Sequence, residues 1–136
     1  MRWVEVSGIR IGFEQVGKGP PLILVHWAVS DGRVWQHQLD ALQDEFTVVA
    51  WDAPGCGRSA DPPESFRLDA LSSICVPTLV VHGDADERSP LTVADDLHRS
   101  IPTSSLVVLS GLGHECYLED PDSFNAEVRS FLRAHS

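Results

Sequence analysis

The sequence predicts an α/β fold, with a mostly parallel sheet of about six strands that begins with an antiparallel hairpin. Short apolar runs recur along the chain, and segments with helical spacing of apolar residues separate them. Most of these runs lack polar alternation, as in strands covered on both faces. The chain has 136 residues, of which 43% are hydrophobic and 22% charged. This length is enough for one core, so we predict a single domain over residues 1–136.

The N-terminal half, residues 1–69, begins with two alternating segments. Residues 3–7 and 9–15 surround Ser7-Gly8, which predicts the hairpin. Residues 22–25 are a continuous apolar run that ends at His26, and we expect a buried strand there.

A helix and a second buried strand complete this half. Trp35, Leu39 and Leu42 recur at helical spacing, and residues 46–51 form the next apolar run. Residues 52–65 are rich in Gly, Pro, Asp and Ser, which predicts a long irregular loop.

The C-terminal half, residues 70–136, contains two more buried strands, predicted at residues 78–82 and 105–109. Two helices are predicted by a capping residue followed by proline, Ser89-Pro90 and Asp120-Pro121. Their inward positions are Val93, Leu97 and Ile101 in the first helix, and Phe124, Val128, Phe131 and Leu132 in the second. A weaker pattern over Phe66, Ala70, Leu71 and Ile74 predicts a short crossover helix within residues 64–75.

Charge and cysteine content narrow the partners and the compartment. The formal net charge of −10 repels nucleic acid and anionic membranes. No stretch approaches 18 apolar residues, and the first residues lack the apolar core of a signal peptide. The three cysteines, Cys56, Cys75 and Cys116, form no C-x-x-C pair. We therefore predict a cytoplasmic protein without nucleic-acid or membrane partners.

In a parallel sheet, catalytic and ligand-binding residues usually lie beyond the carboxyl ends of the strands. The segments to consider there are His26-Trp27, residues 52–59, residues 82–86 and residues 114–116. Asp86 and His114 follow successive strands, and a carboxylate on one ring nitrogen makes a histidine a better base. His82, Asp84, Asp86 and His114 could also form a metal site, but their spacing does not support one, so no metal or cofactor is predicted. His82 lies at a strand end, where we expect a packed or surface histidine.

Four motifs in order resemble those of the α/β-hydrolase family. Residues 52–59, DAPGCGRS, match its D-x-x-G-x-G-x-S loop, and Val25-His26 resembles the strand end before its oxyanion loop. Residues 79–86, LVVHGDAD, resemble its acid loop, and residues 113–121, GHECYLEDP, resemble its histidine loop. The resemblance implies Asp86 as triad acid and His114 as triad base. It also implies that His26, Trp27 and Ala28 form the oxyanion loop, with the Ala28 amide as donor.

The sequence departs from this family at the nucleophile. The chain contains no G-x-S-x-G motif, which forms the nucleophile elbow in this family. In the family, the elbow, two sheet strands and the cap lie between the D-x-x-G-x-G-x-S loop and the acid loop. Here only residues 60–76 connect those two loops. The chain thus resembles a truncated α/β-hydrolase without a cap, joined near residues 69–71. Closing its sheet requires the strand before His26 to pair with the strand that ends at His82. Trp27 also replaces the usual glycine of the oxyanion loop, which predicts backbone strain there.

Two functions follow from these features. The first is a serine-hydrolase-type protein for a small ester or acyl substrate, with the Asp86–His114 relay present and activity weak or absent. Ser59 and Cys56 are substitute nucleophiles, and Cys116 is a less favoured reactive thiol. The alternative is a non-catalytic scaffold that binds a small apolar or ester-type ligand or a partner. Open sheet edges would favour a homodimer.

Overall fold

The computed structural model describes residues 1–27, 29–65 and 71–136. The chain divides into two compact units, Met1–Phe66 and Arg67–Ser136. The Ala28 amide, predicted as an oxyanion donor, lies outside the described residues. The same is true of residues 66–70, which form the middle of the predicted crossover helix within residues 64–75 and include most of the predicted junction at residues 69–71.

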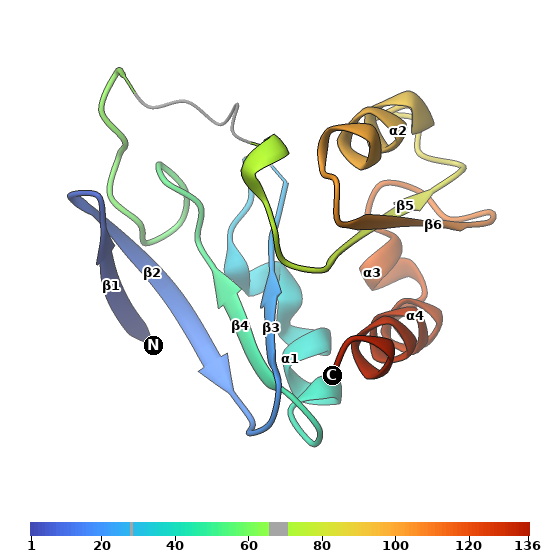
Figure 1. Ribbon diagram of the computed structural model, residues 1–136, viewed down its shortest axis with the longest axis horizontal. Coiled ribbons are helices and arrows are strands. Elements are labelled where there is room, and N and C mark those ends of the chain that lie inside the picture. Colours follow the sequence, from blue (N-terminus) through green and yellow to red (C-terminus); the bar gives the residue numbers. More distant parts are fainter. Residues whose placement is uncertain (28, 66–70) are drawn as a thin grey trace. The chain divides into compact units, whose positions relative to one another are not determined.

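The first unit contains a four-stranded sheet in the order β1-β2-β4-β3 (Figure 1). Strands β1 (Arg2–Val6) and β2 (Ile9–Val16) form the predicted hairpin. Its turn has positive φ at both Ser7 (50°) and Gly8 (80°), as a tight hairpin turn requires. Strand β4 (Thr47–Trp51) pairs antiparallel with β2 and parallel with β3 (Pro21–Leu24).

One face of this sheet carries the core of the first unit. The 3₁₀ helix η1 (Gly32–Trp35) runs into helix α1 (Gln36–Leu42), and the predicted inward residues Trp35, Leu39 and Leu42 are buried. Burial alternates along β4, and Ile23 of β3 is 63% exposed. The prediction of strands covered on both faces is therefore wrong for this unit, where only α1 and η1 supply helical cover within the described ranges.

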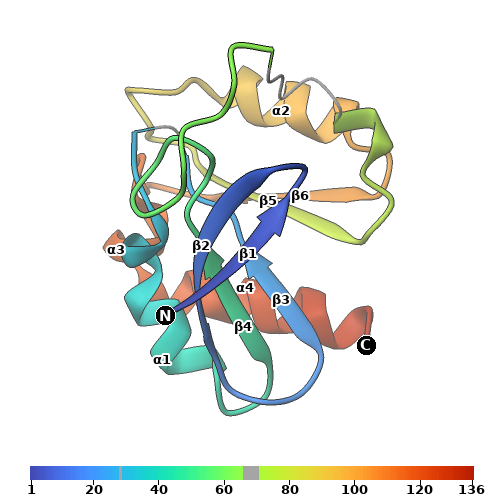
Figure 2. The same cartoon turned by 90° about the vertical axis from the view of Figure 1, so that its left-hand side faces the viewer.

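The second unit is a parallel strand pair enclosed by helices. Strand β5 (Thr78–Gly83) pairs with β6 (Ser104–Leu109), and helix α2 (Leu91–Ser100) connects them. Helix α2 lies on one side of the pair, and α3 (Cys116–Glu119) and α4 (Pro121–Ala134) lie on the other (Figures 1 and 2). The inward residues Phe124, Val128 and Leu132 of α4 are buried, as predicted.

The described strands form two sheets, which corrects the prediction of one mostly parallel sheet of about six strands. Strand β3 pairs only with β4, and β5 only with β6, so the two strands predicted to be neighbours lie in different sheets. A parallel crossover usually needs a connection of a dozen or more residues, most often helical. In the described part of the β4–β5 connection, the regular structure is the three-residue 3₁₀ helix η2 (Leu71–Ser73).

The two predicted helix caps differ in outcome. Asp120 caps α4 as expected, because its side chain accepts a hydrogen bond from the Ser123 N–H at 3.1 Å. Ser89 does not cap α2, where Pro90 occupies the N-cap position. The backbone groups of Ser89 instead bond to Asp86 and His82. Within the described ranges, no helix combines the length and the apolar character needed to cross a membrane.

Candidate acid–base site

Asp86 and His114 lie on two loops of the second unit that meet beyond the ends of β5 and β6. Asp86 follows β5, and His114 follows β6 in the next loop. The loops approach so closely at Gly83 that a Cβ there would overlap the carbonyl oxygens of Leu112 and Gly113. Glycine is therefore required at the end of β5 to bring the two side chains together.

The predicted pair is formed. The Nδ1 atom of His114 lies 2.8 Å from Oδ2 of Asp86. The Oδ1 atom of Asp86 accepts hydrogen bonds from the backbone N–H groups of Arg88, at 2.8 Å, and Ser89, at 2.9 Å. The Asp86 side chain is only 3% exposed. Three donors thus hold a buried carboxylate in one orientation, with one oxygen directed at the histidine.

The hydrogen bonds of Asp86 determine its protonation. Burial acts to raise the pKa of this carboxyl, but the bonds from His114, Ser89 and Arg88 outweigh it and hold the pKa below the ordinary value. An ionised Asp86 accepts a hydrogen bond from Nδ1–H of His114, so the neutral ring has its lone pair on Nε2. His114 is 25% exposed, which leaves the ring accessible to a small molecule.

Further hydrogen bonds fix the loop that carries His114. The N–H of Gly113 donates to Oε2 of Glu119 at 2.8 Å, and the N–H of Gly111 donates to Oδ1 of Asp84 at 2.6 Å. The N–H of Ala85 donates to the Leu112 carbonyl at 2.9 Å. The acid loop and the histidine loop are therefore bonded to each other at two points besides the Asp86–His114 contact.

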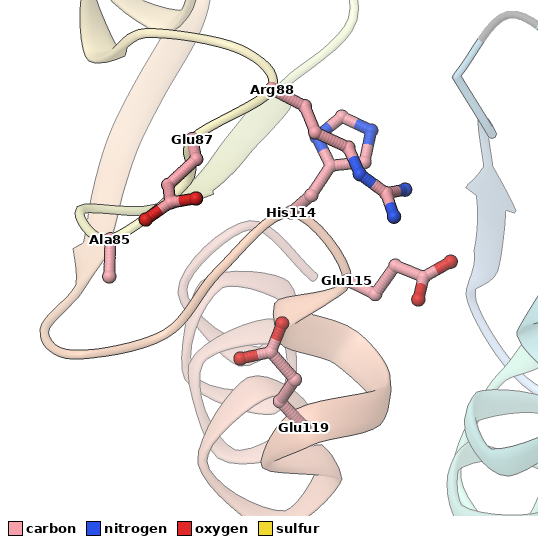
Figure 3. Close-up of a pocket in the computed structure, with 6 residues that line it drawn as sticks. All are labelled: Ala85, Glu87, Arg88, His114, Glu115 and Glu119. Carbon is pink, nitrogen blue, oxygen red and sulfur yellow. The ribbon is translucent and has the colours of Figure 1, made fainter.

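A pocket of about 240 Å³ adjoins His114 (Figure 3). Apart from His114 and Ala85, its lining residues are charged: Glu87, Arg88, Glu115 and Glu119. All four are exposed at the surface of the second unit. The walls of this pocket are therefore mostly polar.

His82 belongs to this cluster, although the sequence predicted only a packed or surface histidine. Its Nε2 atom lies 3.0 Å from the Ser89 carbonyl oxygen, to which it donates, and 3.8 Å from Oδ2 of Asp86. The sequence contains a feature that indicates this position: His82 directly precedes Gly83 and stands four residues before Asp86, at the same end of the strand.

The predicted oxyanion-loop residues lie in the first unit. Nδ1 of His26 donates to the Trp27 carbonyl at 2.7 Å, and Nε2 accepts the Ala53 N–H at 2.9 Å. Both ring nitrogens of this buried histidine thus join two backbone segments. The strain predicted at Trp27 is absent, because among the described non-glycine residues only Ser7 and Val29 have positive φ.

The two substitute nucleophiles lie in the 52–59 loop of the same unit. The Ser59 hydroxyl donates to the Asp52 carbonyl at 2.6 Å and accepts the Gly12 N–H at 2.9 Å, which gives it a bridging role between this loop and β2. Cys56 is half-buried, and its backbone N–H and carbonyl close the turns to Ala53 and Ser59.

Asp52 organises this loop and was not singled out as a buried ion-pair residue. Its fully buried carboxylate accepts from the Gly32 N–H at 2.8 Å, the Arg58 N–H at 2.9 Å and the Arg58 guanidinium at 2.5 and 2.9 Å. Burial opposes ionisation, but these donors keep the pKa of Asp52 below its ordinary value.

The buried thiol of Cys116 has limited reactivity. Burial raises the pKa of this thiol, and only the thiolate is strongly nucleophilic. Within the described residues, no group of three or more His, Cys, Asp or Glu side chains could hold a metal ion.

Comparison with known proteins places these features in a family context. Residues 40–136 match the profile described as TAP-like protein. The AB hydrolase superfamily protein YisY of Bacillus subtilis is 36% identical over 61 residues, which are 45% of this chain and 23% of that protein. A pimeloyl-[acyl-carrier protein] methyl ester esterase of Vibrio atlanticus is 50% identical over 44 residues, 32% of this chain and 17% of that protein.

A solved structure of a thermophilic esterase from Thermogutta terrifontis superposes with a TM-score of 0.79 at 17% identity, covering 98% of this chain and 99% of the other. That likeness concerns the fold alone. The matched segments span less than a third of the length of these two curated relatives.

Proposed function

The chain belongs to the α/β-hydrolase family, and we propose that it retains the acid–base part of a hydrolase site for small polar esters or acyl compounds. Asp86 is the acid of this site and His114 is its base. The Asp86–His114 hydrogen bond of 2.8 Å carries the proposal, because it orients the ring and fixes which nitrogen is available as a base.

The chemistry available to the pair is general base catalysis. Nε2 of His114 takes a proton from a water molecule as the water oxygen attacks the acyl carbon, and the ionised Asp86 stabilises the imidazolium that forms. The imidazolium then returns the proton to the departing alkoxide. The products are an acid and an alcohol, and no other reactant is consumed.

Turnover by this route is weak. The sequence contains no G-x-S-x-G elbow, and the Ser59 hydroxyl bridges two backbone groups. The members of a catalytic triad act as a unit, so losing the nucleophile removes most of the rate enhancement. A positioned general base by itself contributes about 10²–10⁴-fold.

The charged pocket favours polar substrates over apolar ones. Three of its lining residues are glutamates, and Arg88 is the only fully cationic residue among the six. A small ester with a polar or cationic alcohol part therefore fits this lining better than a long acyl chain does.

A second candidate is a non-catalytic scaffold that binds a ligand or a partner. The bridging role of Ser59 and the burial of Cys116 favour it, because both groups serve structural contacts. The two candidates share the same fold and differ in whether His114 supports a reaction.

Two assays on the purified chain distinguish them. The first is labelling by a fluorophosphonate probe, and the second is release of p-nitrophenol from p-nitrophenyl acetate. We expect His114→Ala to abolish any probe labelling and to reduce ester hydrolysis well below the rate of the native chain, toward the uncatalysed rate in buffer. His98→Ala is the matched control, since His98 is an exposed histidine on α2 of the same unit.

Equal ester hydrolysis by the native chain, His114→Ala and His98→Ala would reject the acid–base proposal and leave the scaffold. Hydrolysis that depends on His114, without probe labelling, would indicate direct attack by water. Labelling that depends on His114 would reveal a nucleophile, and mass spectrometry of the labelled peptide would identify it.

A further inference from the structure

His82 and Ser89 stand on either side of the turn that carries Asp86. His82 is in β5, and Ser89 directly precedes the proline at the start of α2. The His82 side chain is 12% exposed. Its Nε2–H donates to the Ser89 carbonyl oxygen at 3.0 Å, which closes the turn with a side chain from the strand that enters it.

The same turn supplies the donors of Asp86. The Ser89 N–H bonds to Oδ1 of Asp86 at 2.9 Å, while Oδ2 faces His114 at 2.8 Å. A continuous path of hydrogen bonds therefore runs from His82 through Ser89 to Asp86 and on to His114. Together with the Arg88 N–H, which bonds to Oδ1 at 2.8 Å, the Ser89 N–H fixes the rotamer of the carboxylate.

We propose that His82 is a positioning residue for the Asp86–His114 pair, acting through the backbone of Ser89. Without its Nε2–H, the half-buried Ser89 carbonyl loses its partner, and the turn relaxes toward solvent to recover one. The Ser89 N–H then moves away from Oδ1 of Asp86. Asp86 then keeps only the Arg88 N–H as a donor to Oδ1, so the carboxylate rotates more easily and fixes the ring of His114 less firmly.

The geometry also specifies the protonation state of His82. Donation from Nε2 to a carbonyl requires the proton to be on that nitrogen. The Nε2 atom is 3.8 Å from Oδ2 of Asp86, too far for a hydrogen bond, so His114 remains the histidine partner of this oxygen. The two histidines therefore use opposite nitrogens, Nε2–H in His82 and Nδ1–H in His114.

The proposal rests on the proposed function only in treating Asp86 and His114 as the functional pair. Nitrogen-15 NMR of the histidine rings tests the proposal and requires no enzymatic activity. In the native chain at neutral pH, we expect neutral His82 to be the Nε2–H tautomer. An Nδ1–H tautomer at His82 would overturn the proposal without any variant.

Three substitutions then test the positioning role. His82→Gln places an amide donor near the position of Nε2, His82→Phe keeps a ring without a donor, and His82→Asn keeps a polar side chain that is too short to reach. The readout is solvent exchange of the Nδ1 proton of His114. We expect about fivefold faster exchange in the Phe and Asn variants, as for loss of one hydrogen bond, and exchange within about twofold of native in the Gln variant.

His98→Gln controls for removing a histidine from the same unit and should leave the His114 signal unchanged. If His82→Phe does not fold, as judged by its amide spectrum, the Asn variant decides. Native exchange of the His114 proton in a folded Phe or Asn variant would overturn the positioning role. Loss of activity in His114→Ala is a separate result, so the two proposals can fail independently.

Discussion

Replacing Asp52 by asparagine should destabilise the first unit far more than the same change at Asp31. Both residues pair with an arginine in that unit, Asp52 with Arg58 and Asp31 with Arg33. The two pairs differ in burial. The Asp52 side chain is inaccessible and Arg58 is 22% exposed, whereas Arg33 is 76% exposed.

The loss of stability in each variant depends on which charged or polar groups remain without a partner. Asp52→Asn removes the charge that faces Arg58 and directs an amide donor toward the donors of Arg58 and Gly32. Breaking a buried ion pair on one side costs about 3–5 kcal/mol, and we expect about 3 kcal/mol because Arg58 can partly reach water. Exposed pairs contribute about 0–1 kcal/mol, and asparagine preserves the cap that Asp31 provides to η1.

Urea denaturation followed by tryptophan fluorescence measures this difference for the first unit. All 4 tryptophans of the chain, Trp3, Trp27, Trp35 and Trp51, lie in that unit. A loss of about 3 kcal/mol shifts the midpoint by about 1–3 M urea at ordinary slopes. Equal midpoints for the two variants would refute the view that burial of the Asp52 pair controls its energetic weight.

Three further predictions concern the second unit. The pKa of Asp86 is lowered on folding, so its stabilisation is full above the ordinary carboxyl pKa of about 3.9 and is lost as the pH falls through the folded value. In the Asp86→Asn variant, the amide protection of β5 and β6 should therefore depend less on pH below about pH 4 than in the native chain. The same acid pH dependence in both proteins would contradict this. Gly83→Ala should cost about 1–3 kcal/mol and weaken the Asp86–His114 bond, because its Cβ meets the carbonyl oxygens of Leu112 and Gly113. Chemical denaturation and the His114 ring signal measure both effects, and native values would argue against the close approach of the loops. Iodoacetamide should alkylate exposed Cys75 first and buried Cys116 last, as peptide mass spectrometry can show, and rapid loss of the Cys116 thiol would disprove its burial.

Much of the local structure could be read from the sequence. The hairpin turn at Ser7-Gly8, the buried positions Leu39 and Leu42, and the Asp120 cap all depend on residues near one another in the chain. The Asp86–His114 pair was identified from motif order, although 28 positions separate the two residues. Order sufficed because the ends of adjacent parallel strands bring their loops to the same edge.

The roles of single polar groups were harder to predict. The sequence offered Ser59 as a nucleophile, but the Gly12 N–H, 47 positions away, is bonded to its hydroxyl. It predicted His82 to be a packed or surface histidine, but the fold places its Nε2 beside the Ser89 carbonyl. A hydroxyl or an imidazole can fill many roles, and its actual partner is known only when the backbone is folded.

The amino-acid sequence by itself determined the order of strands and helices, the capped start of α4 and the residues able to form an acid–base pair. Only the tertiary structure decided that the strands form two sheets, that β3 pairs on one side, and that His82 belongs with Asp86. The physical reason is the sequence distance over which each kind of interaction acts. Periodicity and capping act over a few residues, whereas strand partners and hydrogen-bond partners depend on contacts between segments far apart in the chain.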